Sequence, residues 1–197
     1  MTKIKLASAA AIFDRRFYRT FGGGVPDIKE SRMLIAKRPE NDDWSPGQWS
    51  PPVETYEPKE DENIHKHPLQ EVMKNAFLRG FQEEFIPDKR LGLPSLQYIG
   101  NYSDEKTNFT VYSFMGYFWN NSAWSPRRDL KDMLHTTKEV PEYGWKTLQE
   151  VIEMKKKDEI AGEKFIDMVV QEVERRMTGD PQFEGRQDTL SRWYLKI

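Results

Sequence analysis

The stretch from Pro68 to Pro87, PLQEVMKNAFLRGFQEEFIP, limits what this chain can fold into more than any other part of it. Proline is tolerated in the first turn of a helix but cannot continue the hydrogen-bond ladder, so the two prolines mark a start and a stop. Between them, apolar side chains recur every four positions and share one helix face: Met73, Phe77, Phe81 and Phe85. We therefore predict one amphipathic helix that ends just before Pro87 and packs against a core.

Beside the apolar stripe, this helix carries charge around a residue that has no side chain. At about 100° per residue, Gly80 lies to one side of Phe77. Glu83 and Glu84 flank this glycine, and Arg79 precedes Glu83 by one turn. The pattern predicts either a carboxylate patch that binds a ligand or simply the solvated face of a core helix.

The segment Arg79–Glu84, RGFQEE, resembles a degenerate Nudix box, whose core reads Arg-Glu-apolar-x-Glu-Glu before a turn. The arginine, the apolar residue and the two later glutamates are present, whereas Gly80 replaces the first glutamate and Ile86 replaces the usual turn glycine. Two flanking segments add to the resemblance. GQWSPPVE at 47–54 is similar to the approach to the box, and EVPEYGW at 139–145 is similar to the late segment of the family.

The resemblance implies an α/β fold, namely a Nudix-like α/β/α sandwich with a mixed sheet and a C-terminal helical extension. We expect residues 1–157 to form the Nudix-like domain, and residues 158–197 to add a helix and a tail packed on it. The apolar end of this tail could also dock on a second subunit, so a homodimer is one expected state. Apolar patterning predicts strands at 4–13, 32–37, 91–103 and 108–119, and helices at 142–154 and 161–177.

For activity, the resemblance implies hydrolysis of a diphosphate bond in a nucleoside diphosphate linked to another moiety, by metal-assisted attack of water. It implies Mg²⁺ or Mn²⁺ as cofactor, held by Glu83, Glu84 and Glu54, since such hard cations prefer oxygen ligands. Arg79 is expected to act with the two adjacent glutamates by orienting a carboxylate, because a guanidinium cannot ligate a metal. Gly80 removes one carboxylate, so we expect a weak metal affinity that Gly80→Glu would raise.

Three residues outside the helix are assigned to substrate binding: Arg19, Arg38 and Trp49. Arg19 lies beside a glycine run at 22–24, where a flap could bring guanidinium groups to substrate phosphates. Arg38 and Trp49 lie on either side of the loop that leads to the box. The expected partner is therefore a small-molecule, nucleotide-type substrate.

An acidic, hydrophilic stretch, TYEPKEDENIHKH at 55–67, separates Glu54 from the helix. Members of the resembled family usually connect these two points in a few residues. The stretch lacks periodicity, which favours a solvated excursion. The alternative is that its carboxylates, among them Glu60 and Asp61, or its two histidines add metal ligands or substrate contacts.

Composition excludes several other kinds of protein. With no cysteine, the chain has no disulfide, thiolate metal site or cysteine nucleophile. A formal net charge of -2 argues against a nucleic-acid polymer as partner, and no run approaches the roughly 18 apolar residues that cross a bilayer. The opening IKLASAAAIF is expected to be a strand rather than a signal peptide, and we expect a cytoplasmic protein.

Two other functions stay open on the same fold. The replaced box glutamate and the missing glycine pair favour a catalytically weak or inactive Nudix-like module that binds a nucleotide or a protein. An isomerase of isoprenoid diphosphates is disfavoured, because that chemistry in relatives relies on a cysteine and this chain has none.

Overall fold

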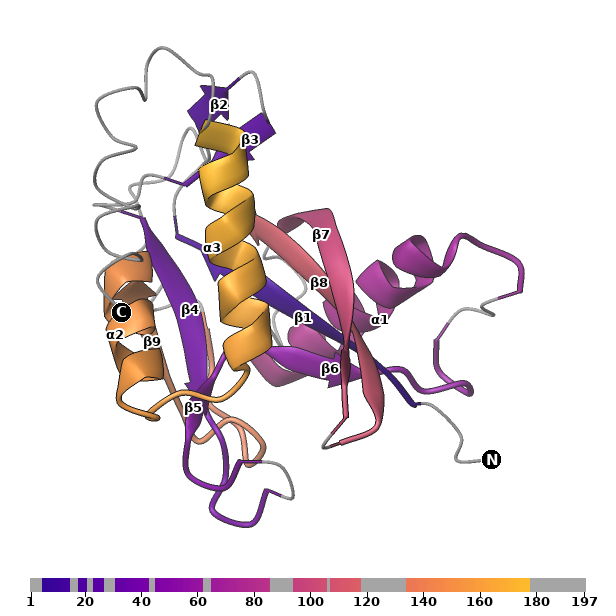
Figure 1. Cartoon of the computed structure of the whole chain (residues 1–197). Coiled ribbons are helices and arrows are strands. Elements are labelled where there is room, and N and C mark those ends of the chain that lie inside the picture. The colour runs from indigo at the N-terminus through magenta and orange to yellow at the C-terminus, as the bar shows by residue number, and fades with distance from the viewer. Residues whose placement is uncertain are drawn as a thin grey trace, which may run out of the picture.

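In the computed structural model, one mixed sheet lies between helix α1 on one face and helices α2 and α3 on the other (Figure 1). The described residues are 5–14, 18–20, 23–26, 31–42, 45–61, 65–85, 94–105, 107–117 and 134–177, with the backbone alone at 18–20 and 23. The strands are β1 (Lys5–Phe13), β2 (Tyr18–Thr20), β3 (Gly23–Val25), β4 (Arg32–Lys37), β5 (Trp49–Ser50), β6 (Val53–Thr55), β7 (Ser95–Asp104), β8 (Phe109–Tyr117) and β9 (Glu142–Thr147). The helices are α1 (Leu69–Phe85), α2 (Leu148–Lys156) and α3 (Glu163–Met177). The expected α/β/α sandwich is confirmed.

The main sheet has the strand order β5-β4-β1-β8-β7, with β6 added beside β1 and β9 beside β4. Strands β1 and β8 run parallel over the whole length of β1, while the other pairs in this sheet are antiparallel. Strands β2 and β3 form a separate antiparallel pair. The predicted mixed sheet is therefore confirmed.

The edge of β1 that faces away from β8 is divided between two partner strands, and this division positions the site. The first half of β1 pairs with β6, where Ser8 lies opposite Glu54. The far end pairs with β4 only at Phe13, opposite Met33. Strand β4 thus meets β1 at one end, and its other end, at Lys37, lies beside a pocket.

Helix α1 covers one face of the sheet with the phenylalanine stripe predicted from the sequence. Phe77, Phe81 and Phe85 are fully buried. Their rings stack, with centroids 5.6 Å and 4.8 Å apart for the successive pairs. They pack on small or branched side chains of the sheet, among them Ala10 and Ile12 of β1. This packing fixes which side of α1 faces away from the sheet.

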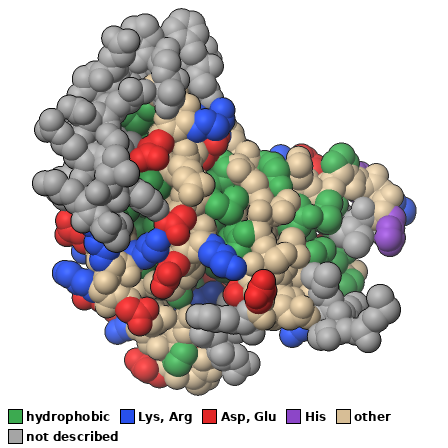
Figure 2. Space-filling model, in the orientation of Figure 1, with side chains coloured by type: hydrophobic (Ala, Val, Ile, Leu, Met, Phe, Trp, Pro, Cys, Tyr) green, Lys and Arg blue, Asp and Glu red, His purple; other side chains and the backbone are tan. Residues whose placement is uncertain are grey.

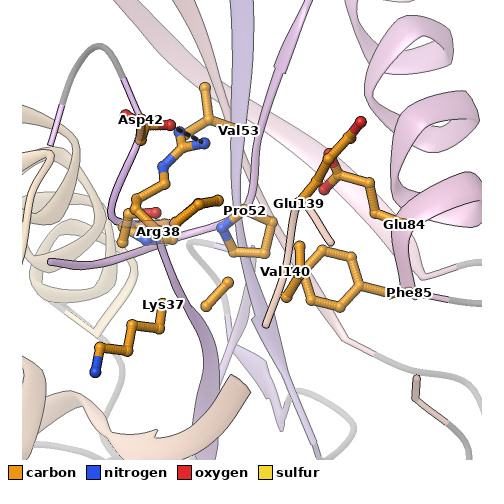
Figure 3. A pocket seen from close by; sticks show the side chains of 13 residues that line it. Lys37, Arg38, Asp42, Pro52, Val53, Glu84, Phe85, Glu139 and Val140 are labelled. Atoms are coloured by element: carbon orange, nitrogen blue, oxygen red, sulfur yellow. Dashed lines mark ion pairs between the residues drawn. The ribbon is translucent and has the colours of Figure 1, made fainter. Parts of the chain in front are cut away.

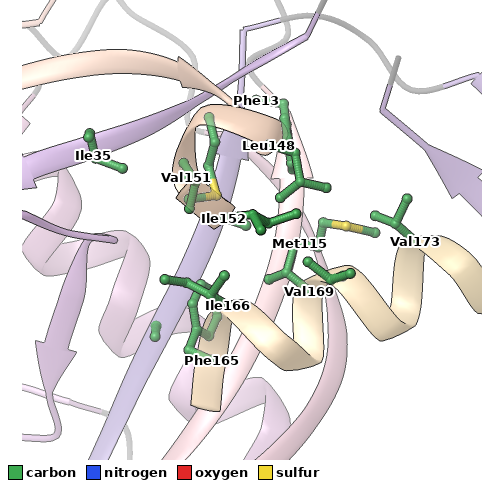
Figure 4. Packing of buried hydrophobic residues seen from close by; sticks show 14 of the residues in the cluster. Phe13, Ile35, Met115, Leu148, Val151, Ile152, Phe165, Ile166, Val169 and Val173 are labelled. Carbon is green, nitrogen blue, oxygen red and sulfur yellow. The ribbon is translucent and has the colours of Figure 1, made fainter. Parts of the chain in front are cut away.

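Helices α2 and α3 cover the other face, where alternate residues of β1 and β8 point (Figure 4). Val169 and Val173 of α3 are fully buried there, close to Met115 of β8. Arg176 anchors the end of α3, because its Nη1 donates to the Gly24 carbonyl and to Gln97 Oε1, both at 2.7 Å. Strand β3 is thereby held against the body.

The helix predicted at 142–154 is wrong for its first half. Residues 142–147 form β9, which pairs with β4 so that Trp145 lies opposite Leu34. Helix α2 starts only after Thr147, whose hydroxyl accepts the Glu150 N–H while the Glu150 carboxylate accepts the Thr147 N–H. This capping box was the sequence signal for the true start of the helix.

The surface seen from the α3 side carries acidic and basic side chains interspersed over the helices (Figure 2). Such mixing fits the near-neutral net charge of the chain. The acidic and basic groups on this face therefore give it no large field of one sign.

Among the described helices, none is long and apolar enough to span a membrane.

Replacing Phe81 with alanine tests the predicted role of the aromatic stripe. Phe81 is fully buried between two stacked rings, so Phe81→Ala should lower the free energy of unfolding by about 3–5 kcal/mol. Urea denaturation measures the change. Gln70→Ala, at an exposed position of the same helix, should stay within about 0.5 kcal/mol of the parent. Equal effects of the two substitutions would contradict this packing.

Candidate functional site

A pocket of about 250 Å³ opens where the end of β4 faces the end of α1 (Figure 3). The residues that line it come from four segments: 36–39 with Asp42, 50–53, Glu84 with Phe85, and Glu139 with Val140. Proline and phenylalanine side chains provide apolar walls, and charged groups of both signs lie among them. The pocket is therefore a mixed site in which an anionic ligand and a cation could be held together.

Two carboxyl groups line this pocket, and a third contacts one of them. Glu84 from the last turn of α1 and Glu139 from the loop before β9 both line it, and their carboxyl groups lie close together in Figure 3. Glu84 shares side-chain hydrogen bonds with Glu139 and also with Glu54 of β6. Glu139 was not assigned to the site from the sequence, although it opens the late segment that resembles the family.

Burial and crowding raise the pKa values of two of these groups. Burial, reinforced by the neighbouring Glu84 carboxylate, raises the pKa of Glu54 to about 9. Burial, followed by the hydrogen bond and charge of Glu139, raises the pKa of Glu84 to about 7. Arg38 acts in the opposite direction on both groups. The carboxyl cluster therefore favours either protons or a bound positive charge.

The Glu54 carboxyl group fills the space beside Gly80. A Cβ built at position 80 would overlap the carboxyl carbon and Oε2 of Glu54 and would lie 2.7 Å from Oε1. The expectation that Gly80→Glu would add a carboxylate assumed an open position. The structure corrects this assumption, because a side chain at position 80 would compete with Glu54 for the same volume.

Glu83 and Glu84 are adjacent in sequence but do not face the same place. The Glu83 side chain is 61% exposed and pairs with Arg79 Nη1 at 3.2 Å, whereas Glu84 lines the pocket. Among the residues described around the cavity, Glu83 and Arg79 are not part of its lining. The structure thus brings Glu84 and Glu54 together, with Glu139, and leaves Glu83 on the surface.

Arg79 is paired with carboxylates of the acidic stretch at 55–67, which is called the acidic insertion below. Its Nε donates to Asp61 Oδ1 at 2.8 Å and its Nη1 lies 3.3 Å from Glu60 Oε2. The Asp61 hydrogen bond raises the pKa of Arg79 above its usual value. Asp61 also accepts the Glu57 N–H at 2.6 Å, and its side chain is only 2% exposed. The insertion is therefore not wholly solvated, since Asp61 ties it to α1.

The three residues assigned to substrate binding lie in different places. Arg38 lines the pocket, where its Nη1 lies 3.5 Å from Asp42 Oδ2 (Figure 3). Trp49 packs instead against the core under α2 and α3, and its carbonyl accepts the Ala161 N–H at 2.7 Å. Arg19 lies in β2, but its side chain is outside the part of the chain that the structure describes. The apolar tail likewise lies outside the described residues.

The donor set of the pocket fits a hard divalent cation in its chemistry. Glu54, Glu84 and Glu139 offer oxygen only, which Mg²⁺ prefers. Glu54 Oε1 is buried and has no hydrogen-bond partner, although a buried polar atom normally has one. Within the described ranges, however, no three Asp, Glu or His side chains stand ready to hold a metal ion. These carboxyl groups would have to separate from one another to ligate one.

Solved structures match this fold over most of the chain. The MutT protein from Methanosarcina mazei Go1 aligns with a TM-score of 0.51 at 19% identity, over 85% of this chain and 91% of that one. A NUDIX hydrolase from Alicyclobacillus acidocaldarius aligns with a TM-score of 0.54 at 13% identity, over 93% and 96%. Another from Nitrosomonas europaea gives 0.50 at 14%, over 92% and 76%. At these identities the likeness establishes the fold alone.

Sequence comparison adds no closer relationship. No protein-family model matches the chain, and no curated protein matches it. The roles of individual residues therefore have to be argued from the geometry of the pocket.

Asp61 and Glu60 both contact Arg79, but they should differ in their contribution to stability. Asp61 is almost fully buried, whereas the Glu60 side chain is 55% exposed. We expect Asp61→Ala to lower the free energy of unfolding by about 1–3 kcal/mol, because it removes the hydrogen bonds that a buried carboxylate accepts from Arg79 and from the Glu57 N–H. Glu60→Ala should cost no more than about 1 kcal/mol. Urea denaturation of both variants measures this, and similar losses would argue against the Asp61 anchor.

Proposed function

Because the chain has the Nudix fold, we propose that it is a Nudix-type hydrolase that uses Mg²⁺ or Mn²⁺. Its substrate is a nucleoside diphosphate linked to another moiety, and the bond cleaved is the diphosphate bond. The proposal rests on one observation: Glu84, Glu139 and Arg38 line the same pocket. One cavity thus has carboxyl oxygens, which could ligate a cation, and a guanidinium group, which could bind a phosphate. The names of the solved structures, a MutT protein and NUDIX hydrolases, support the same class.

The cation would be held by Glu54, Glu84 and Glu139. When bound, a divalent cation neutralises charge on phosphate oxygens and lowers the pKa of an attacking water. Glu84 and Glu139 line the pocket, so their oxygens can reach a substrate held there. Glu54 lies behind them and shares a hydrogen bond with Glu84. Of the residues assigned from the sequence, Glu84 and Glu54 keep their proposed role, and Glu139 takes the place given to Glu83.

Arg38 is the residue proposed to bind the diphosphate. A guanidinium group matches two phosphate oxygens at once, and it cannot lose its proton at neutral pH. Arg38 lines the pocket, with its Nη1 3.5 Å from Asp42 Oδ2, so a phosphate group bound there would compete with Asp42 for its donors. Pro51, Pro52 and Phe85 also line the pocket and would give the bound substrate apolar contacts.

A catalytically inactive binding module is the second candidate. Two observations favour it. The Glu84 carboxyl group is hydrogen-bonded to those of Glu139 and Glu54. In the described part of the chain, no three acidic or histidine side chains are arranged as a ready metal site. Such a protein would bind the nucleotide through Arg38 without turning it over.

A screen of hydrolysis with matched glutamine variants tests the proposal. Dinucleoside polyphosphates, ADP-sugars and nucleoside triphosphates would be incubated with Mg²⁺ or Mn²⁺, and released phosphate species would be measured. On the substrate that is turned over, Glu84→Gln and Glu139→Gln should each lower kcat by about 10-fold to 100-fold or more, as loss of metal-site groups typically does. Glu71→Gln, at the other end of the same helix, serves as the control.

Glu83→Gln separates the assignment made from the sequence from the one made from the geometry. If Glu83 were a ligand equal to Glu84, the two glutamine variants would lose activity to the same extent. The exposed position of Glu83 predicts a much smaller loss. Nucleotide binding by the wild type without any turnover would select the inactive module, and neither binding nor turnover would contradict both candidates.

A further inference from the structure

We propose that Gly80 is a positioning residue: because it has no side chain, the Glu54 carboxyl group can occupy the space beside it, which is called the seat below. In this arrangement strand β6 supplies to the site a carboxylate that helix α1 does not carry. The inference rests on the proposed function of the pocket. It adds that positions 54 and 80 form a pair, in which only one of the two residues can have a side chain in the shared volume.

Steric contact is the first argument for this pairing. The three nearest heavy atoms to a Cβ built at Gly80 all belong to the Glu54 carboxyl group. A side chain at position 80 would therefore meet Glu54 before any other residue. The carboxyl group could remain where it is only if position 80 stayed without a Cβ.

The backbone of Gly80 gives no other reason for a glycine. Among the described glycines, those with a positive φ are Gly47, Gly100 and Gly162, so Gly80 has a conformation that any residue can adopt. It lies inside α1, where glycine lowers helix stability relative to alanine. The feature of this position that favours a glycine is the Glu54 carboxyl group, which occupies the space of a Cβ.

The main chain of Glu54 is held in place independently of its side chain. Strand β6 pairs with β1, with Glu54 opposite Ser8. Tyr56, the first residue after β6, donates its N–H to the Leu6 carbonyl at 3.0 Å. With the main chain of β6 held on β1, the Glu54 carboxyl group lies beside Gly80 and within hydrogen-bond reach of Glu84.

Titration with Mn²⁺ by calorimetry tests the pairing on the full chain. Gly80→Ala should weaken Mn²⁺ binding by about 10-fold to 100-fold, because its methyl group displaces the Glu54 carboxyl group. Its thermal unfolding midpoint should not fall, since alanine favours the helix. A residue that served only stability would show the opposite pattern.

Moving the carboxylate from β6 to α1 tests whether Mn²⁺ affinity can be restored. Glu54→Ala should lose Mn²⁺ affinity as Gly80→Ala does, and the double variant Glu54→Ala/Gly80→Glu should regain most of it, because the helix then supplies the group. Gly144→Ala is the matched control, since a Cβ there would lie 3.8 Å from the nearest Trp49 ring atoms, an ordinary contact. Wild-type affinity in Gly80→Ala, or a double variant as weak as Glu54→Ala, would overturn the proposal.

Failure of the proposed function would be recognisable separately. If the wild type bound no Mn²⁺, the proposed metal-dependent function would be contradicted. A crystal structure of Gly80→Ala would then test whether the Glu54 carboxyl group depends on the missing side chain of Gly80. A Glu54 carboxyl group displaced from the seat would support it. A carboxyl group unchanged beside the new methyl group would overturn it.

Discussion

The burial of the Glu54 carboxyl group beside that of Glu84 is the constraint on which the rest of the site depends. Two acidic groups removed from water in contact with each other cannot both ionise without a compensating charge. Arg38 and Arg79 lower the pKa of Glu54, yet burial and Glu84 keep it far above the usual value. The same pressure acts on Glu84 through burial and Glu139. Ionised carboxylates in such a cluster repel one another, so a bound positive charge stabilises them. A cation-dependent phosphate enzyme requires this property.

The fold creates this cluster by dividing one edge of β1 between two strands. Pairing of β6 with the first half of β1 places Glu54 under α1. The phenylalanine stripe of α1 sets the rotation of that helix, so that Gly80 faces Glu54 and Glu84 faces the pocket. Strand β4, which meets β1 only at its far end, carries Arg38 to the opposite wall. Core packing and site geometry are therefore parts of one arrangement.

Much of this architecture follows from local patterns in the sequence. Two prolines and the four-residue spacing of the aromatic stripe located α1 within a residue or two of its bounds. Trp145 was misplaced in a helix, because its pairing with Leu34 is a long-range contact that periodicity does not encode. For the same reason the sequence pointed to both Glu83 and Glu84. Only the positions of Glu54 and of Glu139, which are distant along the chain, decide which of the two faces the pocket.

The most direct measurement of the central claim is anomalous diffraction from crystals soaked in Mn²⁺. A cation bound by Glu84 and Glu139 should give an anomalous peak within ligand distance of their carboxyl oxygens. The hydrogen bond between these two carboxyl groups should then be broken. Glu83 should remain paired with Arg79 on the surface, as it is now. Full Mn²⁺ occupancy elsewhere, with the Glu54, Glu84 and Glu139 carboxyl groups still bonded to one another, would contradict the account.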